Sequence, residues 1–313
     1  MLVRKSLHSS LVSLVALSGT LLLVTGCSSS SKSQGLPEEK QITKQEPVPM
    51  EEQKDAEAQP PAANAGPGDH HEEMHPDEKS HMEHHATAHP RWGYEGVLGP
   101  QMWGDLAAEY STCKAGDMQS PIDLKWSKPS QGRPLQFNYK PSRLKIIDNG
   151  HTIQINADQG SQLVVNGETF DLIQVHFHAQ SEHTLSGKHF PMEMHFVHKS
   201  ASGKLAVVGR MLKVGDKANP VIEKIWANLP KQKTMEMEAA GHAIDFSAML
   251  PKSLTYYNYA GSLTTPPCTQ GVDWNVLNTP LEISKDQLAA FRALYSNNFR
   301  PVQSLNGRKA INY

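Results

Sequence analysis

Two short segments decide the fold: QVHFH at residues 174–178 and EMHFV at residues 193–197. Both alternate between apolar and polar side chains, which is the period of a β-strand. Residues two apart on a strand face the same side, so His176 and His178 project together, with apolar neighbours facing the opposite way. The stretch between the segments is long enough to reverse the chain. We therefore expect two neighbouring antiparallel strands.

Pairing of these strands would bring His195 to the same point as His176 and His178. Three neutral imidazoles with one open coordination position are typical of a catalytic zinc site. Gln174 and Glu193 each precede a ligand by two residues, so they share its face and can accept the free ring N–H of an imidazole. A lone His on a strand is usually a packed core residue, but this combination predicts one catalytic Zn²⁺ as cofactor.

Further short alternating runs, bounded by Gly, Pro, Asn and Asp, lie at residues 144–147, 152–155, 162–165 and 205–208. They indicate a sheet-dominated fold. Helices are expected only at 220–229 and at 284–294. Ser284 would cap the second helix, with Leu288, Phe291, Ala293 and Leu294 on its buried side. Residues 90–313 fit one domain better than two.

The balance of acidic and basic residues also changes between residues 89 and 90. Residues 28–89 carry 13 Asp and Glu against 5 Lys and Arg, whereas residues 90–313 carry 19 against 23. No dense basic stripe appears, so no nucleic-acid partner is expected. The acidic stretch has seven Pro and no aromatic residue, and it cannot offset a chain entropy of ~1–2 kcal/mol per residue by burial. We predict that residues 28–89 form a disordered acidic tether.

The tether is rich in histidine, with His70, His71, His75, His81, His84, His85 and His89. Residues 71–75 read HEEMH, the His-Glu-x-x-His pattern of zinc proteases. That chemistry needs a rigid amphipathic helix, and Pro76 with polar flanks argues against one. Two interpretations of the His70–His89 tract stay open: a solvated linker, or a loose tract that adds weak zinc or copper binding.

The first 27 residues resemble a bacterial lipoprotein signal peptide. Arg4 and Lys5 precede an apolar run at 11–24, which ends in the lipobox-like LVTGC of residues 23–27. Cys27 is then the predicted lipidation site, and ordinary secretory cleavage nearby is the alternative. Lipid attachment predicts an exported protein anchored in the bacterial cell envelope, at the outer membrane or in the periplasm, which contacts the membrane through its N-terminal lipid only.

Two further cysteines, Cys113 and Cys268, lie in the globular part. In an exported protein they are expected to form a disulfide, with two buried free thiols as the alternative.

Six ordered motifs extend the pattern across nearly all of residues 90–313. They are SPI at 120–122, NGH at 149–151, HFHAQSEHT at 176–184, EMHFVH at 193–198, YAGSLTTPPC at 259–268 and NFRPVQ at 298–303. Together they resemble the α-class carbonic anhydrases. The resemblance implies a mainly β (α+β) fold with a twisted, mostly antiparallel central sheet and short peripheral helices. It also implies the Cys113–Cys268 disulfide, bracing the Thr264 loop.

The resemblance further implies a zinc lyase that hydrates carbon dioxide to bicarbonate and a proton. It implies His151 as proton shuttle, with a His in a surface turn as the alternative. Thr264 would orient the nucleophile through Glu182, and Thr264 and Thr265 would contact bicarbonate. The apolar wall that receives carbon dioxide would comprise Val197, Val207, Leu263 and Trp274, and Tyr94 and Gln154 would line a water chain. Gln154 departs from the more usual Asn.

Two alternatives remain open at this point. One is a non-catalytic zinc-binding or storage lipoprotein built on the same fold, and the other is a periplasmic metal-delivery protein centred on the His70–His89 tract. The partners expected are the small-molecule substrate and the membrane. A homodimer is compatible with the sequence, but nothing in the sequence specifies one.

Overall fold

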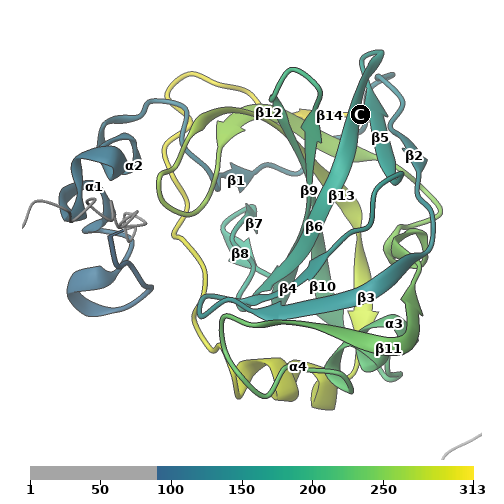
Figure 1. Ribbon diagram of the computed structural model, residues 1–313. Coiled ribbons are helices and arrows are strands. Elements are labelled where there is room, and N and C mark those ends of the chain that lie inside the picture. The colour runs from purple at the N-terminus through teal and green to yellow at the C-terminus, as the bar shows by residue number, and fades with distance from the viewer. Residues whose placement is uncertain (1–89) are drawn as a thin grey trace, which may run out of the picture. The chain divides into compact units, whose positions relative to one another are not determined.

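A large sheet organises the part of the chain that the computed structural model describes, residues 90–313 (Figure 1). The predictions for the signal peptide, for Cys27 and for the His70–His89 tract lie outside these residues. No helix among the described residues is long and apolar enough to cross a membrane.

The large sheet has eleven strands, in the order β11-β3-β4-β6-β9-β10-β13-β12-β14, with β5 paired to β6 and β2 paired to β5. The strands are β2 Gln136–Asn138, β3 Ser142–Asp148, β4 Ile153–Asn156, β5 Gln162–Val165, β6 Glu168–His178, β9 Met192–Ser200, β10 Leu205–Val214, β11 Glu236–Ile244, β12 Tyr256–Ser262, β13 Gln270–Ile283 and β14 Ile311–Asn312. Within this large sheet only the pair β10 and β13 runs parallel, so the expectation of a mostly antiparallel sheet is confirmed.

Alternation along the strands divides the apolar residues between the two faces of this sheet. Val175 and Phe177 of β6 are fully buried in the larger core, on the face opposite the histidines. Helices α3, Pro220–Trp226, and α4, Lys285–Arg292, cover that core, where Trp226 packs against both Phe177 and Phe291. The opposite face is therefore free to carry polar side chains over a second, smaller apolar cluster.

Smaller elements complete the fold. Strands β1 Asp123–Leu124, β7 Thr184–Leu185 and β8 Lys188–His189 form a three-stranded sheet. Helices α1, Trp103–Leu106, and α2, Thr112–Ala115, are single turns, and 3₁₀ turns span Gly96–Leu98, Ala108–Tyr110 and Phe246–Met249. The Cys113–Cys268 disulfide is present and joins α2 to the loop before β13.

The helix ends differ from the sequence prediction. Ser284 does cap α4, in a reciprocal capping box with Gln287. The helix stops at Arg292, however, so Ala293 and Leu294 are exposed rather than buried, and only Phe291 is fully buried. Helix α3 likewise stops at Trp226, before the predicted end at 229.

Candidate metal centre

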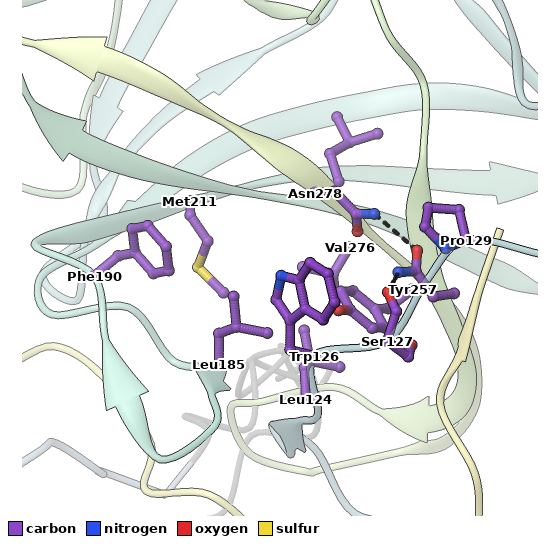
Figure 2. Close-up of a pocket in the computed structure, with 12 residues that line it drawn as sticks. Leu124, Trp126, Ser127, Pro129, Leu185, Phe190, Met211, Tyr257, Val276 and Asn278 are labelled. Carbon is purple, nitrogen blue, oxygen red and sulfur yellow. Dashed lines mark hydrogen bonds between the residues drawn. The ribbon is translucent and has the colours of Figure 1, made fainter.

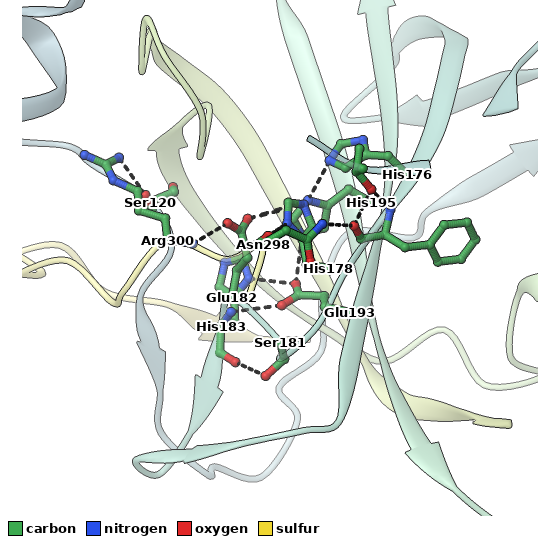
Figure 3. A network of polar contacts seen from close by, with 12 residues as sticks. Ser120, His176, His178, Ser181, Glu182, His183, Glu193, His195, Asn298 and Arg300 are labelled. Atoms are coloured by element: carbon green, nitrogen blue, oxygen red, sulfur yellow. Dashed lines mark hydrogen bonds and ion pairs between the residues drawn. The ribbon is translucent and has the colours of Figure 1, made fainter. Parts of the chain in front are cut away.

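Strands β6 and β9 carry the three histidines (Figure 3). The strands are antiparallel neighbours, and His176 lies directly opposite His195 in the register, with His178 paired to Glu193. Residues paired across antiparallel strands present their side chains on the same face. The predicted strand pairing is confirmed, and it brings the three imidazoles together from one face of the sheet.

The outward ring nitrogen of each histidine is held by a hydrogen-bond acceptor. His176 Nδ1 lies 2.8 Å from Gln174 Oε1, and His195 Nε2 lies 3.1 Å from Glu193 Oε1. His178 Nδ1 lies 2.7 Å from the backbone oxygen of Asn298. Because each outer nitrogen must carry the proton to donate, the inner nitrogen of each ring keeps a free lone pair.

The three inner nitrogens face one another. His195 Nδ1 lies 3.3 Å from His176 Nε2, and His178 Nε2 is buried with no hydrogen-bond partner. Donor atoms of the three residues all lie within 4.8 Å of one another. A tetrahedral ion with bonds of ~2.0–2.1 Å would have ligand atoms about 3.3 Å apart. These residues therefore fit a zinc ion, which would satisfy lone pairs that otherwise repel one another.

Burial favours the ligating form of these histidines. It lowers the pKa of His176, His178 and His195 below the ordinary value, to about 4 for His178. The rings are consequently neutral at neutral pH, as metal coordination requires.

Glu193 is held by more than its ligand histidine. Its carboxylate also lies 2.8 Å from His183 Nδ1 and accepts the His183 backbone N–H at 2.9 Å. Burial opposes ionisation, yet the neighbouring His183 and His195 lower the Glu193 pKa well below its usual value. His183, Glu193 and His195 are close enough to form a second candidate metal cluster. We interpret this group as an orienting network, since Glu193 already bonds both rings.

Glu182 lies beside the inner nitrogens. Its Oε2 is 3.6 Å from His178 Nε2, and its Oε1 accepts the backbone N–H of Arg300 at 2.9 Å. Burial raises the pKa of Glu182 to about 7, although His195, the Thr264 side chain and the Arg300 N–H each lower it. Thr264, which lies 82 residues further along the chain, is thus close enough to Glu182 to influence its pKa.

The predicted apolar wall is also assembled. Val207 and Trp274 are fully buried members of the smaller apolar cluster, and Val197 and Leu263 pack against it. The ring of Trp274 lies 4.9 Å from that of His195. Its indole N–H donates to the Ser262 backbone oxygen, which ties the wall to the loop that carries Thr264 and Thr265.

A tight turn presents His151. Asn149 Oδ1 accepts hydrogen bonds from the backbone N–H groups of His151 and Thr152. Gly150, which lies between Asn149 and His151, has a φ of +87°, a conformation that favours glycine. The His151 ring stacks on Trp92 with centroids 3.7 Å apart. The ring is half-buried, and burial together with the charge of Lys233 lowers its pKa.

The two predicted water-chain residues occupy different surroundings. Tyr94 lies edge-on to Trp92 and Trp103, and burial and the charge of Glu182 raise its pKa. The Gln154 amide is engaged by side chains, because Gln154 Nε2 donates to Asn156 Oδ1 at 2.6 Å and Gln154 Oε1 accepts from Asn149 at 3.2 Å.

Three further residues at the site had no predicted role. Asn298 holds His178, His183 holds Glu193, and Arg300 holds Glu182. The Arg300 guanidinium is itself anchored on Gln119 Oε1 and on the backbone oxygens of Ser120 and Cys113. All three residues lie in motifs noted from the sequence, but backbone-mediated contacts between distant segments leave no periodic signal.

Comparison with known proteins agrees with this geometry. Residues 98–312 match the family model described as eukaryotic-type carbonic anhydrase. A carbonic anhydrase of Pectobacterium carotovorum is 43% identical over 227 residues, which are 72% of this chain and 92% of that protein. A carbonic anhydrase of Nostoc sp. is 42% identical, over 70% of this chain and 85% of its own. Among solved structures, the α-carbonic anhydrase of Thermovibrio ammonificans in complex with sulfanilamide has a TM-score of 0.69 and 43% identity, covering 72% of this chain and all of that one.

The fold and the site therefore define a mainly β enzyme with a metal-binding histidine triad. The chain belongs to the α-carbonic anhydrase family, and it is a carbonic anhydrase by this relationship.

Proposed function

We propose that this protein catalyses the zinc-dependent, reversible hydration of carbon dioxide to bicarbonate and a proton. The observation that carries the proposal is the set of three inward nitrogens, of His176, His178 and His195, whose outer nitrogens are all held by acceptors. When bound, zinc supplies a nucleophile at neutral pH by lowering the pKa of water from 15.7 to about 7, the established value for carbonic anhydrase.

Thr264 and Glu182 would orient the attack. Glu182, fixed by the Arg300 N–H, would accept a hydrogen bond from the Thr264 hydroxyl. Thr264 Oγ1 would then be left to accept a hydrogen bond from the attacking oxygen, which aims a lone pair of that oxygen at the carbon of carbon dioxide. The backbone N–H of Thr264 and the hydroxyl of Thr265 would hold the bicarbonate product.

The apolar wall would bind the substrate. Carbon dioxide has no charge and no donor, so a surface formed by Val197, Val207, Leu263 and Trp274 suits it better than a polar one. Bicarbonate is charged and leaves that surface for water, which favours turnover.

Each hydration releases a proton that must leave the site. His151 would accept it, because imidazole is the side chain whose ordinary pKa lies nearest neutrality, and burial and the charge of Lys233 lower the pKa of this ring from that value. Tyr94 and Gln154 would position the intervening waters. The His151 ring stacks on Trp92 and stays partly exposed, so it could pass the proton on to buffer.

Stopped-flow measurement of carbon dioxide hydration by the purified full chain, with zinc content measured on the same sample, tests the proposal. We expect about one zinc per chain and turnover that a chelator abolishes and zinc restores. His195→Ala should lose zinc and activity together. Zinc bound at the triad without any hydration would instead support the alternative, a non-catalytic zinc-binding or storage lipoprotein.

We propose the following domain organisation: residues 1–27 as lipoprotein signal peptide, residues 28–89 as acidic His-rich tether, and residues 90–313 as catalytic domain. Lipidated Cys27 would hold the enzyme in the cell envelope, and the disulfide is consistent with an exported protein. Cys27→Ala should release the protein from the membrane fraction of cells that express it without altering hydration. A Cys27→Ala protein that sediments with membranes as before would contradict lipid anchoring.

A further inference from the structure

A cavity of about 260 Å³ has a lining that includes none of the three triad histidines. Figure 2 shows the residues that line it. Its apolar walls are formed by Leu124, Trp126, Leu185, Phe190, Met211 and Val276. None of these residues was assigned to the reaction. Met211 of β10 lies opposite Glu193 of β9, so the cavity opens on the same face of the sheet as the histidines, displaced along the strands.

One wall of the cavity holds a hydrogen-bond acceptor without a partner. Asn278 lines the cavity, and its side-chain oxygen Oδ1 is buried and unbonded. Its Nδ2 donates to Asn312 Oδ1 at 2.7 Å, while Asn312 Nδ2 donates to the Ser127 backbone oxygen. A backbone oxygen can only accept, which fixes the orientation of Asn312 and, in turn, that of Asn278. The unbonded atom, Asn278 Oδ1, is therefore a hydrogen-bond acceptor without a donor.

The charge of the lining is zero. The twelve residues around the cavity include no Asp, Glu, Lys, Arg or His. Binding an ion there would cost its hydration with no charge in the wall to offset the loss, so the lining excludes charged ligands. Besides Asn278, the polar side chains are those of Ser127, Tyr257 and Asn312.

The exposure of Trp126 indicates that the cavity suits a flat ligand. Trp126 lines the cavity, and yet 76% of its surface is exposed. An exposed indole at the mouth of an apolar cavity offers a flat face on which a ring can stack, and a second ring would bury both faces.

We propose that this cavity is a binding site for a small, neutral aromatic molecule that carries one N–H or O–H donor. The ring lies between Trp126 and the side chains of Met211 and Val276, and the donor bonds to Asn278 Oδ1. The site is independent of the hydration reaction.

Indole and 1-methylindole form a matched pair of probes, because they differ in the N–H donor. The full chain would be labelled with ¹³C at its methionine methyl groups, with the Met211 signal assigned from Met211→Leu. We expect indole to shift the Met211 signal upfield saturably, through the ring current of a bound aromatic. 1-Methylindole should bind at least fivefold more weakly, since it leaves the buried acceptor unpaired.

Variants locate the donor contact. Asn278→Leu should bind the two probes with equal affinity, whereas the matched control Asn228→Leu, at the end of α3 and outside the cavity lining, should keep the wild-type preference. An unmoved Met211 signal at millimolar indole would overturn the proposal. Equal affinity of the two probes for the wild type would also overturn it, by reducing the site to an unspecific apolar hole, and this comparison needs no variant.

Discussion

His176 Nε2 and His195 Nδ1 face each other at 3.3 Å across two antiparallel strands, although Nε2 is the ring nitrogen farther from the backbone and Nδ1 the nearer one. Their companions explain the difference. Gln174 reaches Nδ1 of His176, whereas Glu193 reaches Nε2 of His195, so each leaves the other nitrogen for the metal. The companion residues thus select which tautomer each ligand adopts.

This selection predicts the effect of changing the companions. Gln174→Ala should weaken zinc affinity by roughly 10–100-fold while the apo fold is retained. Competition with a fluorescent zinc chelator measures the affinity, and activity at saturating zinc should recover substantially. Glu238→Ala, at an exposed surface ion pair with Arg143, serves as control and should change neither quantity. Unchanged zinc affinity in Gln174→Ala would show that the companion has no role in orienting His176.

The shuttle assignment predicts a defect that depends on buffer. His151→Ala should bind zinc normally, because the ring makes no contact with the triad in the hydrogen bonds described, but turnover in dilute buffer should fall by roughly 10-fold or more. Added imidazole should restore it. Unchanged turnover at low buffer concentration would mean that His151 is only a surface turn residue.

Lys233 offers a pH test of the same residue. Its charge, together with burial, lowers the His151 pKa, which keeps the ring neutral and able to accept a proton at lower pH. Lys233→Gln should therefore raise that pKa and move the acid limb of the kcat profile to higher pH. If the acid limb of the variant's kcat profile stays at the wild-type pH, the group that titrates in that limb is not His151.

Gly209 lies opposite His195 on β10, where a larger residue has no room. A Cβ at this position would stand 2.9 Å from Glu193 Oε1. Gly209→Ala should therefore displace the carboxylate that holds His195, and reduce zinc affinity at least 10-fold. Gly215→Ala is the control, since there the Cβ would meet only the side chain of Glu282, in an exposed ion pair with Lys213 that can move. Equal zinc affinity for both variants would contradict this steric account.

Alternation in two segments was enough to predict the strand pair, its direction and the triad, because a period of two is a strong local signal and His is a rare residue at such positions. The same logic predicted Gln174 and Glu193 as companions. It could not find Asn298 or Arg300, whose contacts use a backbone oxygen and a backbone N–H from the distant C-terminal segment. Nor did it predict β11 or β12, whose residues lack clean alternation. The end of α4 was set two residues too late because Ala293 and Leu294 continue the helical pattern beyond the last helical residue.

Buried His198 predicts how the fold responds to acid. Its ring is fully buried, with Nε2 2.8 Å from the Tyr139 hydroxyl, and burial lowers its pKa from 6.5 to about 4. In the unfolded chain His198 is therefore protonated near pH 6.5, whereas in the folded chain it is not protonated until about pH 4. The free energy of unfolding is therefore not reduced by His198 above pH 6.5, and it decreases as the pH falls from 6.5 towards 4.

Urea unfolding at pH 7.5 and pH 5 measures this loss against His198→Gln, which can still bond Tyr139 but does not titrate. From the shift, wild type should lose about 2 kcal/mol more than the variant between the two pH values. The variant is expected to be less stable than wild type at pH 7.5, because the amide fills the cavity less well, so the two stabilities should converge in acid. Parallel losses in both proteins would assign the acid sensitivity to other buried groups.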